Sequence, residues 1–430
     1  MTVVWTIVGI VVFFLGILFS VAWHELGHFA TAKWFGIKVP EFFVGFGRTI
    51  WSRRVGETEF GFKAIPLGGY IRMIGMLPPA RGELYGRSRR TGPFQGLIDD
   101  ARQASAMDVG PEDAERQFYT RRPWKRIIVM AAGPVMNLIL AVVLFAIVLM
   151  GFGRLTATST VSSVSQCVLP ATAARTDVCP PGAPLTPAAA AGFQPGDRIV
   201  SFDGRTYDTW ADMQRAIRAA TGTVSVVVDR GGQQVTLTPT LITTELPSLD
   251  DQNTTVQASF LGLSPLQEVQ RQGIGAVGST MVDIVGQVGQ KLVEMPQRVP
   301  NLFGAVFLGQ ERDQDSPVGI VGASRIGGEI LASDAPPGQE ISAFLMLLAL
   351  VNISLFLFNL LPIPPLDGGQ IFPAIWEAIR RRFAALRGRP DPGPVDAAKL
   401  MPVAMTVALI FIGWSALVFV ADVINPVKLG

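Results

Sequence analysis

The chain has 430 residues, of which 49% are hydrophobic and only 16% charged, and its formal net charge is +2. Its mean hydropathy is positive, at +0.38. This composition predicts an integral membrane protein with a soluble portion. The small net charge excludes the strongly basic profile of a nucleic-acid-binding protein, so no nucleic-acid partner is expected.

Four apolar stretches are long enough to cross the hydrocarbon core of a bilayer. They cover residues 3 to about 34, 127–152, 341–361 and 401–423. The first stretch has no basic n-region and no small-residue cleavage site, so we do not interpret it as a cleavable signal peptide. We therefore predict about four transmembrane helices.

The end of the first stretch carries both histidines of the chain, in His24-Glu25-Leu26-Gly27-His28. On a helix, residues four apart differ by about 40° of rotation and about 6 Å of rise, so both imidazoles can bind one metal ion. Glu25 can then face a water molecule rather than the metal. In a soluble protein such a pair is often only a solvated helix face. At bilayer depth, unpaired ionisable side chains are costly, which favours a zinc hydrolase site.

The distribution of basic residues predicts the orientation in the membrane. Lysines and arginines concentrate between the first two apolar stretches and again in the short segment after the third. Both of these segments should be cytoplasmic. The N-terminus, residues 154–340 and the C-terminus should then lie outside the cytoplasm.

Both cysteines, Cys167 and Cys179, lie in the outer segment. An oxidising compartment permits a disulfide there, which would stabilise the fold by about 3 kcal/mol. The alternative is a pair of free thiols in a loop. Neither cysteine is expected to bind the metal, because both lie on the side of the membrane opposite the histidines.

A catalytic zinc site usually takes three protein ligands and leaves one position for water. The chain has no third histidine, so a carboxylate from another membrane segment has to complete the set. Asp367 is the one acid in a suitable place, after a run of prolines that breaks the helix at the cytoplasmic end of the third stretch. The alternative is a helix-ending turn in which Asp367 only caps the segment that follows.

Six motifs follow one another along the chain, namely His24-Glu25-Leu26-Gly27-His28, Gly45-Phe46-Gly47, Pro66-Leu67-Gly68-Gly69-Tyr70, Gly133-Pro134-Val135-Met136-Asn137, Ala191-Gly192-Phe193-Gln194-Pro195-Gly196-Asp197 and the run from Asn359 to Gly369. In this order they resemble the bacterial site-2 proteases, which are intramembrane zinc metalloproteases. The resemblance implies that His24, His28 and Asp367 bind Zn2+ and that Glu25 activates the attacking water. It also implies hydrolysis of a peptide bond in the transmembrane segment of a single-pass substrate.

The same resemblance indicates how the substrate is held. Asn359 is expected to contact the extended substrate. Gly45-Phe46-Gly47 and the strand-like residues 59–73 resemble a re-entrant hairpin whose edge binds substrate by strand addition. For the glycines, ordinary turn formation explains the pattern equally well. Asn137 is polar at membrane depth, and we expect it to orient either a metal ligand or the substrate.

Residues 155–265 mix strand and helix patterns, with strands predicted at 159–164, 224–229 and 233–238 and a helix at 209–219. This order, together with the motif that ends at Asp197, fits a single PDZ domain of the permuted bacterial type. Two roles stay open for it, a peptide-binding module and a steric lid.

The predicted fold is therefore a polytopic α-helical membrane protein with a membrane re-entrant β-hairpin and an inserted extracytoplasmic α+β PDZ domain. Its segments are transmembrane helix 1 (1–36), the hairpin and a cytoplasmic loop (37–123), transmembrane helix 2 (124–152), the PDZ domain (155–265), an amphipathic helical segment (266–340), transmembrane helix 3 (341–373), a cytoplasmic loop (374–400) and transmembrane helix 4 (401–424). Residues 78–116 are interpreted as a solvated linker, with the binding of a regulator as the alternative.

We expect the substrate to be an anti-sigma factor already cut by a site-1 protease, cleaved in the bacterial inner membrane near its cytoplasmic face. Membrane lipids, and a peptide if the PDZ groove is functional, are the other expected partners. Two alternatives are a catalytically silent PDZ scaffold and a zinc transporter. The intact Glu25 argues against the scaffold, and the lack of visible internal repeats argues against the transporter.

Overall fold

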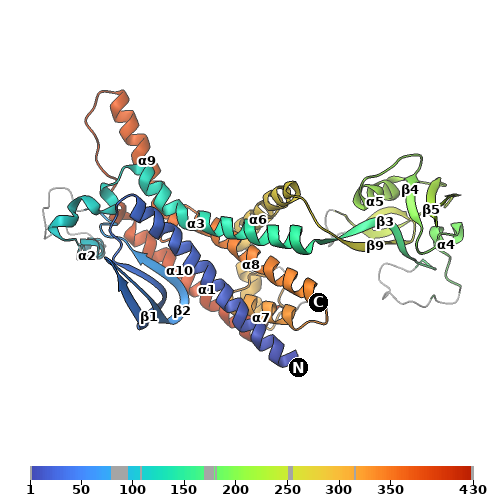
Figure 1. Cartoon of the computed structure of the whole chain (residues 1–430), viewed down its shortest axis with the longest axis horizontal. Coiled ribbons are helices and arrows are strands. Elements are labelled where there is room, and N and C mark those ends of the chain that lie inside the picture. The colour runs from blue at the N-terminus through green and yellow to red at the C-terminus, as the bar shows by residue number, and fades with distance from the viewer. Residues whose placement is uncertain are drawn as a thin grey trace. The chain divides into compact units, whose positions relative to one another are not determined.

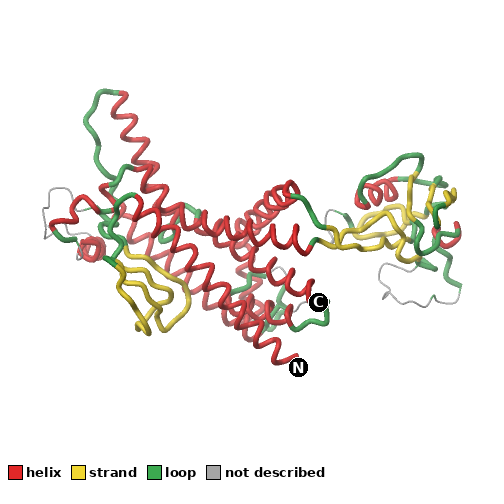
Figure 2. The backbone as a smooth tube through the Cα atoms, viewed as in Figure 1, coloured by secondary structure: helices red, strands yellow, loops and turns green. Residues whose placement is uncertain are grey.

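The protein is described here by a computed structural model that covers residues 2–78, 95–106, 109–168, 179, 182–249, 255–313 and 316–427. The chain divides into two compact units (Figure 1). Unit 1 comprises Met1–Phe152 and Gly273–Gly430, and unit 2 comprises Gly153–Gln272. Figure 2 shows that unit 1 is mainly helical and that unit 2 is built mostly from strands.

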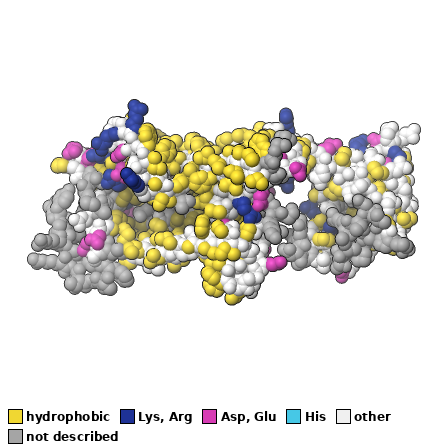
Figure 3. Space-filling model, turned by 90° about the horizontal axis from the view of Figure 1, so that it is seen from below, with side chains coloured by type: hydrophobic (Ala, Val, Ile, Leu, Met, Phe, Trp, Pro, Cys, Tyr) yellow, Lys and Arg dark blue, Asp and Glu magenta, His cyan; other side chains and the backbone are white. Residues whose placement is uncertain are grey.

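Among the described residues, four helices of unit 1 are long and apolar enough to cross a membrane. They are formed by α1 (Thr2–Trp34), α3 (Pro123–Ala146), α8 (Pro337–Asn359) and α10 (Met401–Ile424). These helices confirm the four apolar stretches predicted from the sequence. Hydrophobic side chains cover much of the visible face of this unit (Figure 3), which is the surface that contact with lipid tails requires.

The core of unit 1 lies where α1, α3 and α8 pack together. It buries Phe13 from α1, Phe145 from α3 and Ile353 from α8. A polar contact sits inside this apolar interface, because the amide nitrogen of Asn352 donates to the buried hydroxyl of Ser20 at 2.9 Å. Hydrogen bonds of this kind join helices in a membrane, and this one fixes α1 against α8 one turn before the first histidine.

α1 and α3 approach each other closely at the histidine motif. Trp23 Nε1 donates to the backbone oxygen of Met136 at 2.9 Å. A Cβ atom on Gly27 would lie only 2.5 Å from the backbone oxygen of Ala132, so a larger residue would push the two helices apart. Gly27 therefore brings α3 next to the histidines.

The other helices of unit 1 connect or flank these spans. α6 (Ile274–Phe307) packs its first half against α3 and α8 through Val277 and Met281, and its second half against α10 through Leu302. The remaining elements are α2 (Gln95–Ala106), α7 (Ile320–Leu331), α9 (Asp367–Leu386), a π-helical turn η3 (Ile147–Phe152) and the short turns η1 (Pro111–Arg116), η2 (Phe118–Thr120) and η4 (Ala397–Leu400).

A buried carboxylate holds α7 to α10. Asp422 of α10 accepts the backbone amides of Gly319 and Gly322, each at 2.9 Å, at the N-terminus of α7. The guanidinium of Arg312 donates to the same carboxylate at 3.0 Å. A carboxylate at this position satisfies amides that the helix itself cannot pair. The Ser316-Pro317-Val318-Gly319-Ile320 stretch thus has a structural role.

Strands β1 (Glu41–Val55) and β2 (Thr58–Arg72) form a separate sheet in unit 1, which we call the hairpin sheet. Both strands fold back on themselves, so residues 41–44 pair on one side with residues 59–62 and on the other with residues 69–72. Among the described residues, 69–72 have no other strand partner. They therefore form an edge of this sheet.

Unit 2 is organised around a five-stranded sheet in the order β6-β5-β4-β3-β9. Its elements are β3 (Arg154–Val164), α4 (Pro187–Ala191), β4 (Arg198–Phe202), α5 (Trp210–Ala219), β5 (Val226–Arg230), β6 (Gln233–Leu237) and β9 (Leu263–Gln270), beside a hairpin of β7 (Ile242–Pro247) and β8 (Thr255–Phe260). The predicted strands and the predicted helix of this region are all present. Phe202, Val226 and Met213 lie in its buried core.

A disulfide and a buried ion pair stabilise unit 2. A disulfide joins Cys167 to Cys179, with their Cα atoms 5.9 Å apart, which confirms the bridge predicted from the sequence. Arg230 donates two hydrogen bonds of 2.8 Å to the buried carboxylate of Asp197. This guanidinium lowers the pKa of Asp197, so the carboxylate stays charged and paired at neutral pH.

The structure differs from the predicted segments in three places. Residues 266–270, predicted as helical, belong to β9, because their pairing with β3 completes the sheet of unit 2. Residues 374–386, predicted as loop, continue α9, because basic side chains that mark topology also favour helix. Part of the linker predicted at 78–116 is ordered as α2 and η1, while residues 79–94 and 107–108 lie outside the described residues.

Candidate active site

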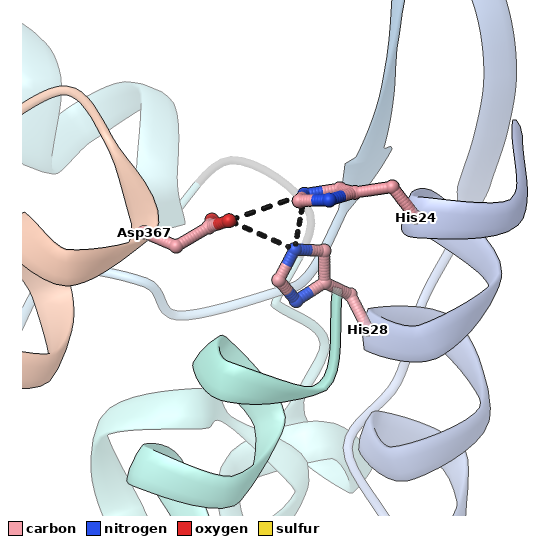
Figure 4. A group of neighbouring side chains, drawn as sticks. All are labelled: His24, His28 and Asp367. Carbon is pink, nitrogen blue, oxygen red and sulfur yellow. Dashed lines mark hydrogen bonds and ion pairs between the residues drawn. The ribbon is translucent and has the colours of Figure 1, made fainter. Parts of the chain in front are cut away.

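Three polar side chains from two distant parts of the chain converge in unit 1 (Figure 4). His24 and His28 come from α1, and Asp367 comes from the first turn of α9. His24 Nε2 lies 3.1 Å from His28 Nε2 and 3.1 Å from Asp367 Oδ2, and His28 Nε2 lies 3.3 Å from Asp367 Oδ2. The three atoms thus form a nearly equilateral triangle, and both histidines are buried.

The hydrogen bond made by Nδ1 of each imidazole determines whether Nε2 can act as a metal ligand. His28 Nδ1 lies 2.7 Å from the backbone oxygen of Val129. A carbonyl can only accept, so Nδ1 carries a proton, and when the ring is neutral Nε2 presents a lone pair. His24 Nδ1 lies 3.2 Å from the amide of Asn137, whose Oδ1 is buried without a hydrogen-bond partner among the described residues. A half-turn of this amide lets His24 Nδ1 donate to Oδ1 and leaves its Nε2 as a second lone pair.

The turn between α8 and α9 brings Asp367 to the histidines. Residues 360–366 fold back against the start of α9, so that a Cβ on Gly368 would collide with the backbone oxygens of Leu360 and Leu361. A Cβ on Gly369 would lie 2.5 Å from the nitrogen of Pro364. The two glycines after Asp367 therefore permit a turn that residues with side chains would open.

The backbone of α3 approaches the two imidazoles at Gly133. A Cβ atom on Gly133 would collide with His28 Nε2 and lie 2.7 Å from His24 Nε2. Any side chain here would therefore displace the imidazoles. Glycine lets the backbone of α3 approach both rings this closely.

The donor set and its spacing fit a zinc ion. A tetrahedral zinc with bonds of about 2.0–2.1 Å holds its ligand atoms about 3.3–3.4 Å apart, close to the three distances found here. Two imidazole nitrogens and one carboxylate oxygen are a common ligand set for catalytic zinc. A cation among the three atoms relieves the repulsion between their buried lone pairs.

Glu25 lies beside the same site and contacts the edge of the hairpin sheet. Its carboxylate accepts a hydrogen bond from the backbone amide of Ile71 in β2. A Cβ on Gly69 would lie 3.1 Å from Glu25 Cγ, so the absence of a side chain there lets the strand edge approach the acid. A carboxylate next to both the metal ligands and a strand edge can exchange protons with a peptide held on that edge.

The sequence also predicts Asn137, Asn359, Gly45 and Gly47 as residues of this site. Asn137 is fully buried and contacts His24 directly. Asn359 ends α8 and donates to the backbone oxygen of Leu355, one turn earlier in the same helix, at 3.0 Å. Gly45 and Gly47 adopt positive φ angles of 94° and 84° where β1 bends, which supports the turn explanation for both.

Phe46, between these glycines, is exposed and stacks on Tyr70, with the ring centroids 6.1 Å apart. Its ring therefore covers part of the hairpin sheet next to the edge formed by residues 69–72. Of the three predicted residues in this motif, Phe46 is the one that offers a side chain to a bound peptide.

Sequence reasoning missed the residues that hold α9 to α3. Arg126 of α3 forms a buried ion pair with Glu377 of α9, which also accepts the backbone amide of Val395 at 2.9 Å and pairs with Arg381 at 3.0 Å. This pair anchors the helix whose first residue is Asp367. No sequence pattern links Arg126 to Glu377, because they are 251 residues apart. The sequence shows only that Glu377 is an acidic residue close to the basic residues of α9.

Comparison with known proteins agrees with this geometry. The model of peptidase family M50 matches residues 12–390. The zinc metalloprotease Rip1 of Mycobacterium tuberculosis is 34% identical over 436 residues, which cover 98% of this chain and 99% of that protein. The metalloprotease MmpA of Caulobacter vibrioides is 29% identical over 395 residues, which cover 87% and 89%. This chain belongs to peptidase family M50.

Membership of peptidase family M50 identifies the chain as a zinc metalloprotease, with Zn2+ as its expected cofactor. The four candidate spans agree with a membrane-embedded member of the family. Within peptidase family M50, the resemblance to site-2 proteases read from the motifs is confirmed.

The role of Gly133 can be tested by adding one methyl group. Gly133→Ala should reduce zinc affinity at least about tenfold, because the new Cβ displaces both imidazoles from their ligand positions. Zinc content of the purified protein, measured by mass spectrometry after dialysis against a weak chelator, gives the result. Gly151→Ala is the matched control, because a Cβ there meets no atom within 4 Å. Equal zinc content in the two variants would contradict this assignment.

Proposed function

We propose that this metalloprotease hydrolyses a peptide bond within the transmembrane segment of a single-pass membrane protein. The observation that carries the proposal is the convergence of His24, His28 and Asp367 on helices of the membrane unit. A protease with its ligands on a membrane-spanning helix acts on chains that enter the membrane. An anti-sigma factor already cut by a site-1 protease is the substrate we propose.

His24, His28 and Asp367 are proposed as the zinc ligands. When bound, zinc polarises the scissile carbonyl and lowers the pKa of water. Asn137 and the Val129 carbonyl hold the two rings so that each Nε2 faces the site. Glu25 takes a proton from the attacking water and delivers it to the nitrogen of the leaving peptide. Two imidazoles, two carboxylates and one amide thus account for the reaction.

The hairpin sheet is proposed to hold the substrate in an extended form. A transmembrane helix hides its carbonyls in internal hydrogen bonds, so the protease has to supply replacement partners before cleavage. Residues 69–72 form a sheet edge that passes Glu25 and can add a substrate strand. We propose that Phe46 and Asn359 contact this strand, and that Gly45 and Gly47 shape the bend of β1 that places it.

The orientation proposed from the sequence places the active site near the cytoplasmic face of the bacterial inner membrane. Basic residues follow α1 and extend into η1 and α9, where the positive-inside rule predicts cytoplasm. Unit 2 and both termini are then extracytoplasmic, the side on which the Cys167–Cys179 disulfide is stable. Membrane lipids are partners of the apolar surface in Figure 3.

Unit 2 is proposed to be a PDZ domain that excludes proteins with large outer domains. Its strands and α5 follow the order expected for a permuted PDZ domain, and it is inserted between η3 and α6 of unit 1. Deleting residues 155–265 should allow cleavage of a full-length anti-sigma factor that the intact enzyme leaves uncut. The measurement is an immunoblot for the cleaved fragment in cells without the site-1 protease. Full-length substrate that stays uncut would contradict the filter.

The hydrolytic role of Glu25 separates a protease from a scaffold or a zinc transporter. Glu25→Gln should lower the rate of cleavage by at least about 100-fold, because an amide cannot accept the proton of the attacking water. Zinc content should stay unchanged, since Glu25 is not among the three ligands. The assay uses a transmembrane peptide in liposomes, and Glu59→Gln, in β2 of the hairpin sheet, is the control. Cleavage by Glu25→Gln at the wild-type rate would refute the proposal.

A further inference from the structure

A cavity of about 270 Å³ lies in unit 1 beside the candidate active site. Its walls come from the segment after β2, from α2, from α9 and from the start of α10. Six of the lining residues are apolar, namely Met73, Ile74, Met76, Leu77, Ala101 and Met401. Arg72, Ser105 and Gln370 complete the lining. The cavity is therefore largely apolar and carries three methionines.

This cavity begins where the sheet edge ends. Arg72, on its wall, directly follows Ile71, whose amide donates to the Glu25 carboxylate. Gln370, which also lines the cavity, lies one helical turn after Asp367 on α9. A peptide strand paired with residues 69–72 would pass from the metal ligands to the mouth of this cavity.

The wall contributed by α2 is held in place by specific contacts. The hydroxyl of Ser105 accepts the backbone amide of Leu77 at 3.0 Å, and its carbonyl accepts the amide of Gly75 at 3.4 Å. Arg102 pairs with Asp396 at 2.6 Å, which ties α2 to the segment before η4. This part of the cytoplasmic loop is therefore built into the structure rather than a solvated linker.

The size and chemistry of the cavity suit an apolar side chain. An apolar cavity of about 150 Å³ admits a benzene molecule, so 270 Å³ accommodates the side chain of Leu, Met or Phe. Methionine side chains are flexible and polarisable, and they adapt to apolar groups of different shapes. Transmembrane segments supply such side chains at nearly every position.

We propose that this cavity is a specificity subsite that takes a large apolar side chain of the substrate near the scissile bond. The proposal rests on the proposed function, because it assumes that a substrate strand pairs with residues 69–72. Strand addition directs alternate side chains of the bound peptide into pockets on one face, and this cavity is the apolar space next to that edge. A lipid acyl chain is the rival occupant.

The test uses full-length enzyme in liposomes and a series of transmembrane peptides. Each position within three residues of the cut carries Ala, Leu or Phe in turn, and kcat/KM is measured for every peptide. Wild-type enzyme should prefer Leu or Phe over Ala by roughly tenfold or more at one position, as expected for an apolar pocket. Ala101→Trp fills the cavity from α2 and should lower kcat/KM for the Leu and Phe peptides by roughly tenfold, to the value of the Ala peptide.

Two further variants make the result specific. Gln103→Trp adds the same side chain on the exposed face of α2 and should leave the preference unchanged. Met401→Ala enlarges the cavity and should shift the preference from Leu toward Phe. Zinc content and thermal unfolding of each variant verify that the fold is intact.

The outcomes that contradict the subsite differ from those that contradict the proposed function. A preference that survives Ala101→Trp, or an equal fall for Ala and Leu peptides, overturns the subsite and favours a lipid or a structural role. A wild-type enzyme that cleaves all peptides equally overturns it as well. If the wild type cleaves none of them, or Glu25→Gln cleaves as fast as the wild type, the proposed function itself fails.

Discussion

The structure depends on three lone pairs that meet at one point inside a largely apolar helical unit. Two imidazole nitrogens and a carboxylate oxygen lie 3.1 to 3.3 Å from one another, close to the distance between two ligand atoms of a tetrahedral zinc. The other ring nitrogen of each histidine lies beside a polar group of α3. Such a cluster is unfavourable without a cation, because the repulsion of buried lone pairs is not screened by water. Zinc binding at the proposed ligands would therefore link the folding of α1, α3 and α9 to the chemistry of the site.

The remaining contacts of unit 1 serve to bring these three helices to the correct distance. Gly27 allows α1 and α3 to touch, Gly133 lets α3 approach both imidazoles, and Gly368 permits the turn that delivers Asp367. The ion pair between Arg126 and Glu377 fixes α9 against α3 well away from the ligands. Breaking a buried pair leaves an uncompensated charge and is strongly destabilising, so this contact restrains the position of Asp367.

The convergence of the three side chains was predictable because it depends on residue type and short spacing. Two histidines four apart, in a chain with no others, left Asp367 as the acid in a suitable place for a third ligand, with helix capping as its alternative role. The four apolar helices were predictable for a similar reason, since length and hydropathy are local properties.

Contacts that depend on tertiary structure were not visible in the same way. The role of Gly133 depends on side chains of α1, which no local pattern reveals. The extension of α9 to Leu386 was missed because its arginines were interpreted only as a topology signal. Strand β9 was partly taken for helix because its partner, β3, lies about 100 residues earlier in the chain. The wall that α2 gives to the cavity likewise depends on contacts with distant segments.

The most direct test of the metal centre is X-ray absorption spectroscopy at the zinc edge, on wild type and on Asp367→Cys. The wild-type spectrum should show only nitrogen and oxygen neighbours at about 2.0–2.1 Å, with the multiple scattering typical of two imidazoles. In Asp367→Cys, one neighbour should become sulfur at about 2.3 Å, because the thiolate takes the place of the carboxylate. The native cysteines form a disulfide in unit 2 and are not available as ligands. A variant that keeps its zinc but shows no sulfur neighbour would contradict the ligand set.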